Sequence, residues 1–329
     1  MNFKLLLLLN LLIILSIIYL FFISIFKKYY FNQNEILRFE KQILSKLNDN
    51  FKVSDKIMYL KLLTNNNKFR YKGIKNCLLN DPDKQFCIYH LLAPKEVIGK
   101  KRILIGPKRD GCYVILNDLK NIKIAYSFGI ARKIQFDKYL ADKGIDVYMY
   151  DHTIDSLPYN NSKFHWKKIG IAGRNNNNNT LLKSLEELII ENGHSSEKNM
   201  ILKIDVEHAE WESLRDLPFK YLSQFKYILI EFHFKDETVL NESLLYYQVI
   251  KKLYKTHQAF YLRCQNRYNI VKFGNNRICH ALEVSYVIKK DYEFTHDSTI
   301  YPIEKFDFSR YIPKREEMNL NILKLFDNY

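Results

Sequence analysis

Short apolar runs alternate with amphipathic segments over most of the chain that follows residue 100. The apolar runs that predict strands are Arg102–Ile105, Cys112–Leu116, Lys123–Phe128, Asp146–Tyr150, Phe164–Ile171, Met200–Ile204 and Tyr227–Phe232. Apolar residues at helical spacing predict helices over Ala131–Asp142, Thr180–Asn192 and Glu242–Lys255. Strands that alternate with helices are typical of a mostly parallel sheet covered by helices on both faces. The sequence therefore predicts an α/β fold.

The ends of these elements carry their own signals. Gly144 and Gly193 stand just past the first two predicted helices, where glycine often ends a helix. Asn241 precedes the third helix and is its predicted N-cap. The predicted buried face of the second helix consists of Leu181, Leu185, Leu188 and Ile189. Two late strands, Ala259–Arg263 and Ala281–Ile288, have no helix between them and predict a C-terminal hairpin.

The N-terminal segment Leu5–Phe26 is almost wholly apolar and uncharged. About 20 such residues in a helix span the hydrocarbon core of a bilayer. No pair of small residues typical of a cleavage site precedes Lys27 and Lys28, so residues 1–28 predict an uncleaved transmembrane anchor. Lys4 before the span and the two lysines after it give nearly balanced orientation signals. The short N-terminal tail favours a single-pass protein of the endoplasmic reticulum or Golgi with a lumenal catalytic domain.

Between the anchor and the α/β pattern the chain is more polar. Residues Tyr29–Lys68 have a helical apolar spacing, and periodicity weakens toward Pro94. We therefore expect a stem or accessory helical segment over residues 29–94 and a catalytic domain over residues 95–329. The run Asn175–Asn179 is typical of a low-complexity loop.

Charge and cysteine content narrow the classes of function. The formal net charge of +15 suits a phosphate, an anionic lipid surface or an acidic substrate. The lysines are scattered, and no stripe of arginines interleaved with aromatic residues stands out, so no nucleic-acid partner is expected. The absence of a C-x-x-C pair argues against a zinc site built from paired thiolates. The pairs Cys77–Cys87 and Cys264–Cys279 would each suit a disulfide in an oxidising compartment.

Polar residues gather where the predicted strands end. Asp205 and Glu207 follow the strand Met200–Ile204, and they lie on the same side of an extended chain because strand side chains alternate. The other strand-end residues are Ser127, Gly129, Asp151, His152, Glu231 and His233. Ligands of doubly wound sheets bind at the carboxyl ends of the strands, so these residues predict one binding site.

The spacing of one glycine and one acid indicates a nucleoside. Asp151 lies about 20 residues beyond Gly129, where an acid binds the ribose hydroxyls in dinucleotide folds. However, the loop holds a single glycine after the bulky Phe128 and lacks the G-x-G-x-x-G pattern that a pyrophosphate requires. A nucleoside without phosphates, such as S-adenosylmethionine, needs less backbone approach and suits this loop better.

A set of motifs in this order resembles a known family. The motifs are Ala125-Tyr-Ser-Phe-Gly-Ile, Phe136-Asp-Lys-Tyr-Leu-Ala, Tyr150-Asp-His-Thr-Ile, Leu202-Lys-Ile-Asp-Val-Glu-His-Ala-Glu-Trp and Ile230-Glu-Phe-His. Together with Arg109-Asp-Gly-Cys-Tyr-Val, they resemble the methyltransferase-like protein 24 family, which is similar to the FkbM-type S-adenosylmethionine-dependent methyltransferases. The resemblance covers Leu104–Ile288. Cys112 and His208 stand where the family has glycine, a residue that permits close approach or a positive φ.

The resemblance implies a Rossmann-like class I methyltransferase fold and a role for each strand-end residue. Ser127 and Gly129 would border the methionine part of S-adenosylmethionine, and Asp151, beside His152, would bind the ribose hydroxyls. Asp205 and Glu207 would lie at the reacting end. The methyl acceptor is not implied, and a sugar hydroxyl, a lipid, a small molecule and a protein side chain all stay open.

Transfer to an alcohol requires loss of its proton. Asp205, Glu207 or His233 would serve as the general base. Alternatively, a divalent ion held by Asp205, Glu231 and His233 would lower the pKa of the acceptor. Carboxylate–imidazole clusters also form hydrogen-bonded networks without an ion, and the sequence does not decide between these arrangements.

Two other classes of function remain open at this stage. The first is a membrane-anchored glycosyltransferase that uses a nucleotide sugar through a D-x-D motif. Asp81-Pro82-Asp83 has that spelling, but it stands in a region of weak strand signals, and Pro82 is unfavourable for strand pairing. The second class is an inactive methyltransferase fold that acts as a binding module.

Overall fold

The computed structural model describes residues 84–106, 111–174, 179–235, 240–265, 270–273 and 276–297, together with 299, 303, 305 and 306. The chain divides into two compact units, Met1–Asn65 and Asn66–Tyr329, and all described residues belong to the second. The predicted anchor Leu5–Phe26 and most of the predicted stem lie outside the described residues. Among the described residues, no helix combines the length and apolarity needed to cross a bilayer.

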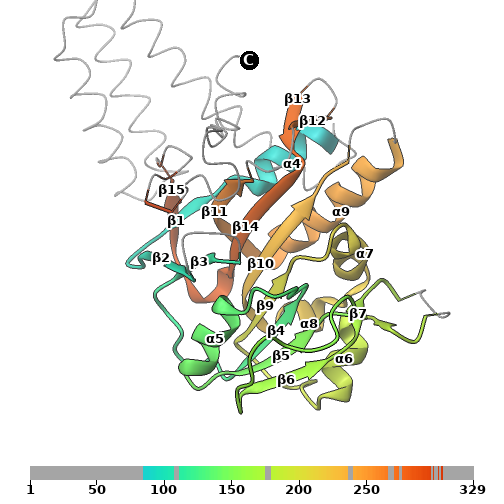
Figure 1. Cartoon of the computed structure of the whole chain (residues 1–329). Helices are drawn as coiled ribbons and strands as arrows, with labels where there is room; N and C mark the ends of the chain where they lie inside the picture. Colours follow the sequence, from blue (N-terminus) through green and yellow to red (C-terminus); the bar gives the residue numbers. More distant parts are fainter. Residues whose placement is uncertain are drawn as a thin grey trace, which may run out of the picture. The chain divides into compact units, whose positions relative to one another are not determined.

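A seven-stranded sheet forms the centre of the fold (Figure 1). Its strands, in spatial order, are β11 (His257–Cys264), β14 (Ala281–Ile288), β10 (Phe225–His233), β9 (Met200–Ile204), β4 (Ile124–Phe128), β5 (Asp146–Tyr150) and β6 (Phe164–Lys167). The strands from β10 to β6 run parallel, whereas β14 is antiparallel to both of its neighbours. The predicted mostly parallel α/β sheet and the pairing of the two late strands are confirmed, and the fold is Rossmann-like.

Helices cover both faces of this sheet. The helices are α4 (Lys84–Leu92), α5 (Gln135–Asp142), α6 (Leu185–Glu191), α7 (Ala209–Asp216), α8 (Phe219–Leu222) and α9 (Leu240–Thr256). The connection β4–α5–β5 steps one way along the sheet, and β9–α7–β10 steps the other way. Right-handed crossovers therefore place α5 and α7 on opposite faces, as the ribbon shows. Helix α9 packs with α7 and α4.

The strands at the centre of the sheet are buried along their whole length. All five residues of β9 and all nine of β10 are buried. This pattern is typical of parallel strands that have helices on both faces, and it explains why they are near-continuous apolar runs in the sequence. Lys203 is the charged exception within β9.

Two predicted helices begin later than expected. The first begins at Gln135 rather than at Ala131, whose φ of 48° is left-handed and incompatible with a right-handed helix. The second begins at Leu185, because Ser184 forms a capping box with Glu187. Leu181 precedes that helix and is 45% exposed, so its predicted place on a buried face is wrong.

Two further boundaries differ from the sequence prediction. Helix α9 covers Leu240–Thr256 and includes Asn241, so the N-cap role predicted for Asn241 is wrong. The predicted strand Phe164–Ile171 is divided in two: β6 joins the central sheet, and β7 (Gly170–Ile171) pairs with β8 (Leu182–Lys183). Lys168 and Ile169 make the turn between the two, and the backbone N–H of Ile169 donates to the carbonyl of Lys167.

Small sheets and disulfides complete the described part of the chain. The smaller sheets pair β1 (Lys95–Val97) with β15 (Phe294–His296), β2 (Arg102–Ile105) with β3 (Tyr113–Leu116), and β12 (Ile270–Phe273) with β13 (Asn276–Cys279). The predicted disulfide Cys264–Cys279 is confirmed and links the end of β11 to β13. Cys87 is also disulfide-bonded, whereas its predicted partner Cys77 lies outside the described residues.

Candidate active site at the carboxyl edge of the sheet

Three adjacent strands reach the same edge of the central sheet, and β10 runs three residues further than its neighbours, from Ile230 to His233. In the register of the parallel strands, Phe128 of β4 pairs with Ile204 of β9, and Ile204 pairs with Ile230 of β10. The residues that follow Ile204 and Ile230 are Asp205 and Glu231. These two predicted site residues therefore occupy neighbouring positions because the strands are parallel and in this register.

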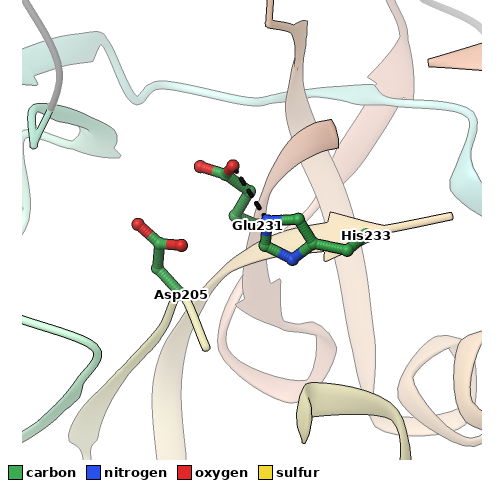
Figure 2. A group of neighbouring side chains, drawn as sticks. All are labelled: Asp205, Glu231 and His233. Carbon is green, nitrogen blue, oxygen red and sulfur yellow. Dashed lines mark ion pairs between the residues drawn. The ribbon is translucent and has the colours of Figure 1, made fainter. Parts of the chain in front are cut away.

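The predicted cluster of Asp205, Glu231 and His233 is assembled at this edge. Figure 2 shows the three side chains directed toward one another from β10 and the end of β9. Each contributes one ligand atom, and these atoms lie within 4.8 Å of one another. His233 Nε2 lies 3.2 Å from Glu231 Oε1 and 3.4 Å from Glu207 Oε2. The imidazole is fully buried, whereas the Glu207 side chain is 68% exposed at the rim.

Glu210 holds the other side of the imidazole. It is the second residue of α7 and is fully buried. Its Oε1 accepts hydrogen bonds from His233 Nδ1 at 3.2 Å and from the His233 backbone N–H at 2.8 Å. The His233 carbonyl in turn accepts from Trp211 Nε1 at 2.8 Å. These bonds orient the ring so that Nε2 is directed at the carboxylates. Glu210 had no predicted role, although it stands only three residues after Glu207 in the sequence.

Burial and neighbouring charges shift the pKa values of the cluster. Burial raises the pKa of Asp205, although the charges of Lys203 and His233 oppose this shift. Burial also raises the pKa of Glu231, and the nearby charge of Asp205 adds to the effect. Burial alone would lower the pKa of His233, but the carboxylates of Glu210 and Glu231 outweigh it and raise that pKa to about 11. The neighbouring carboxylates therefore favour the protonated form of the imidazole.

The charged cluster continues across the antiparallel strands. Glu231 pairs in register with Glu283 of β14, and Glu283 pairs with Arg263 of β11. Arg263 Nη1 lies 3.2 Å from Glu283 Oε1. Gln265 Nε2 donates to Glu231 Oε2 and, at 3.2 Å, to Glu283 Oε1. This row was not predicted from the sequence, because it depends on β14 lying between β10 and β11.

The glycine loop after β4 contacts the site through its backbone. Gly129 has a φ of 70°, and a Cβ added there would lie 1.5 Å from the carbonyl oxygen of Asp205. The Asp205 N–H donates to the Phe128 carbonyl at 3.2 Å. Only glycine permits this approach, so Gly129 brings the loops after β4 and β9 together.

Asp151 organises the same loop. Its Oδ2 accepts hydrogen bonds from the N–H groups of Ile130 and Ala131 at 2.9 and 2.7 Å. Its Oδ1 accepts from the N–H and the hydroxyl of Thr153 at 2.8 and 2.6 Å. These bonds keep the pKa of Asp151 below its usual value against the opposing effect of burial, which is the largest single influence. Four donors already occupy the carboxylate, so a ribose hydroxyl would have to replace one of them. His152, the next residue, is exposed.

Ser127 lies in a buried polar group beneath the loop. Ser127 and Asp137 of α5 are each 1% exposed, and Lys203 of β9 is 4% exposed. Lys203 Nζ donates to the carbonyls of Phe128 and Gly129 at 3.0 and 2.5 Å. Burial raises the pKa of Asp137, and the charge of Lys203 opposes this. Lys203 had no predicted role, although a lysine inside the apolar run Met200–Ile204 was itself a signal.

His208 adopts the backbone conformation that favours glycine. Its φ is 84° and its ψ is −19°, and it immediately precedes α7. This agrees with the resemblance, in which a glycine stands at the position. Its Nδ1 lies 3.2 Å from the His233 carbonyl, and its ring packs against those of His233 and His280.

Substitutions at His208 should separate backbone strain from side-chain contact. His208→Gly and His208→Ala both remove the ring, but only alanine keeps a Cβ at this positive φ. We expect the glycine variant to be more stable than the alanine variant by about 1 kcal/mol. Urea denaturation of the two variants measures the difference. An alanine variant of equal or greater stability would show that this backbone is not strained.

Comparisons with known proteins leave the site to be interpreted from its own residues. The chain matches no protein-family model, and no curated protein sequence shows significant similarity to it. The resemblance of the strand-end motifs to the methyltransferase-like protein 24 family therefore stays a prediction. What the geometry establishes is a Rossmann-like sheet with a buried carboxylate–imidazole cluster at its carboxyl edge.

Proposed function

We propose that this protein is an S-adenosylmethionine-dependent methyltransferase that methylates an oxygen of its acceptor. The observation that carries the proposal is the order of the central strands. Numbered along the chain, they lie in the order 3-2-1-4-5-7-6, with only strand 7 antiparallel. This order is typical of class I methyltransferases, whereas the dinucleotide-binding Rossmann sheet has the order 3-2-1-4-5-6.

The position of the candidate site supports the same class. Strand β4 has β5 on one side and β9 on the other, so the chain changes direction along the sheet beside β4. Ligands of such sheets bind at this switch point, outside the carboxyl ends of the strands. Gly129, Asp151 and Asp205 all follow strands at this edge. In the proposed complex, Ser127 and Gly129 border the methionine part of the cofactor, and Asp151 and His152 lie toward the ribose.

The cluster supplies the groups that methyl transfer to a hydroxyl requires. The acceptor oxygen forms a bond to the methyl carbon while the carbon–sulfur bond breaks, which leaves S-adenosylhomocysteine. The proton of the hydroxyl passes to a carboxylate, and Glu207 at the exposed rim is the accessible candidate. Asp205 and His233 position the reacting groups, since positioning contributes much of the acceleration in a displacement of this kind.

Cofactor binding tests the proposal directly. Calorimetric titration of the purified full chain with S-adenosylmethionine should give a saturable heat. Asp151→Ala should weaken binding roughly 5- to 150-fold, the equivalent of about 1–3 kcal/mol for an unpaired polar group. Asp155→Ala is the matched control, because the Asp155 side chain is 94% exposed in the following loop. Thermal melting of both variants checks that the fold is kept.

Two results would overturn the proposal. No heat at millimolar S-adenosylmethionine would leave an inactive fold that acts as a binding module. Binding of a nucleotide sugar in its place would favour the glycosyltransferase, whose motif Asp81-Pro82-Asp83 lies outside the described residues. Equal cofactor affinity in the Asp151 and Asp155 variants would remove the ribose assignment alone. The proposed membrane anchor and the nature of the acceptor are separate from this test.

A further inference from the structure

The geometry points to a divalent-cation centre formed by Asp205, Glu231 and His233, at which the acceptor hydroxyl binds and loses its proton. This inference deepens the proposed function and rests on it for the identity of the reaction. The binding of the cation itself does not depend on that reaction. The two statements can therefore be tested apart.

The spacing of the three ligand atoms suits a single ion. Oxygen and nitrogen ligands lie about 2.0–2.3 Å from a bound divalent transition metal, so two ligands of one ion are separated by at most about 4.6 Å. The three ligand atoms of the cluster span no more than 4.8 Å. They come from the ends of two adjacent parallel strands, which are rigid and fully buried elements. Small side-chain rotations therefore complete the set without backbone movement.

The surroundings of His233 are those of a metal-binding imidazole. A histidine that binds a metal through one ring nitrogen usually donates its other N–H to a carboxylate or carbonyl. Here Nδ1 donates to the buried Glu210 at 3.2 Å, which leaves Nε2 directed at Glu231 (Figure 2). Glu210 also accepts the backbone N–H of His233 at 2.8 Å. The ring is thus oriented by two bonds to one residue that is not itself a ligand.

Glu231 and Asp205 offer oxygens to the same space. One oxygen of Glu231 accepts from Gln265, and the other is directed at His233. The Asp205 carboxylate accepts no hydrogen bond from any residue that the structure describes. Asp205 is half-buried and Glu231 is buried, and two carboxylates that face one another repel. A divalent cation between Asp205 and Glu231 would offset this repulsion.

The donor set also selects among cations. Two carboxylate oxygens with one imidazole nitrogen favour Mn²⁺, Fe²⁺ or Zn²⁺ over Mg²⁺ and Ca²⁺, which prefer oxygen ligands alone. An acceptor hydroxyl would reach the ion from the side of Glu207, whose side chain is exposed and lies 3.4 Å from His233 Nε2. An acceptor hydroxyl bound there transfers its proton to the Glu207 carboxylate. Its oxygen then attacks the methyl carbon as the carbon–sulfur bond breaks.

Titration with Mn²⁺ tests the centre. The purified full chain is stripped with a chelator and titrated with Mn²⁺ by calorimetry, and one ion should bind per chain. His233→Gln and Glu231→Gln should each weaken binding by more than about 100-fold, beyond the range of an outer-shell loss. Glu210→Gln, which removes only the orienting charge, should weaken it about 10- to 100-fold. His257→Gln is the matched control. His257 is an equally buried imidazole at the start of β11, whereas the cluster lies level with Arg263 near the end of that strand. This substitution should leave the affinity for Mn²⁺ unchanged.

A measurement on the chain without substitutions tests the centre even if a variant fails to fold. Pulsed electron paramagnetic resonance of the Mn²⁺ complex should show coupling to one imidazole nitrogen. No stoichiometric Mn²⁺ binding, no nitrogen coupling, or full affinity in a folded His233→Gln variant would each overturn the metal centre. Titration of the stripped chain with S-adenosylmethionine separates the two proposals. Cofactor binding without Mn²⁺ binding removes only the metal centre, and Mn²⁺ binding without cofactor binding removes only the methyltransferase.

Discussion

Gly129→Ala should destabilise the domain by more than about 4 kcal/mol, a loss that few single substitutions reach. The added Cβ would lie 1.5 Å from the carbonyl oxygen of Asp205, which is backbone and cannot rotate away. The clash would separate the loops after β4 and β9, and the hydrogen bond from the Asp205 N–H to Phe128 would be lost. The candidate site would be disrupted together with the fold. Urea denaturation monitored by circular dichroism gives the free energy of unfolding.

Gly144 supplies the control for this substitution. It also has a positive φ, 83°, but an added Cβ there would meet no atom within 4 Å. Gly144→Ala should therefore cost only the backbone strain, about 1 kcal/mol. The difference between the two variants isolates the contact with Asp205. Losses of similar size at both positions would show that Gly129 is needed for its φ alone.

The centre of the fold was predictable because its buried strands are visible in the sequence as apolar runs. The strands β4, β9 and β10 are buried almost throughout, so most of their residues are apolar without alternation. Parallel strands also place their carboxyl ends at one edge, which is why Asp205, Glu231 and His233 could be grouped from the sequence alone. Their mutual distances bear out that grouping.

What the sequence did not reveal depends on contacts between distant residues. The start of α5 was missed because the left-handed φ of Ala131 has no signal in an alanine. The Glu283–Arg263 pair requires β14 to lie between β10 and β11, an order that periodicity does not encode. Asp151 followed its strand as predicted, but its four hydrogen bonds within the loop depend on the fold of Ile130 and Ala131.

His257 makes the stability of the domain depend on pH. It is fully buried at the start of β11, where Nε2 donates to the Phe225 carbonyl at 2.9 Å and the Thr256 hydroxyl lies 2.8 Å from Nδ1. Burial lowers its pKa from 6.5 to about 4, and the charges of Lys289 and Lys290 act in the same direction. The neutral imidazole is therefore part of the folded structure, and protonation would bury an unpaired charge.

The direction of the effect follows from the two pKa values. Above pH 6.5 the imidazole is neutral in both the folded and the unfolded state, so the stability is fully present. As the pH falls from 6.5 toward 4, the unfolded chain binds a proton that the folded chain does not, and stability is lost. At about 1.4 kcal/mol per pKa unit, the loss attributable to His257 approaches about 3 kcal/mol at pH 4.

Comparison with His257→Gln isolates this contribution from those of other titrating groups. Glutamine keeps an amide that can donate to the Phe225 carbonyl, but it has no proton to gain in this range. The variant should therefore lose less stability than the wild type between pH 6.5 and pH 4, while the difference between the two stays constant above pH 7. Urea denaturation at intervals across this range measures both curves. Parallel curves down to pH 4 would mean that the imidazole titrates alike in the folded and unfolded chains. The prediction that His257 stays neutral in the folded chain would then be wrong.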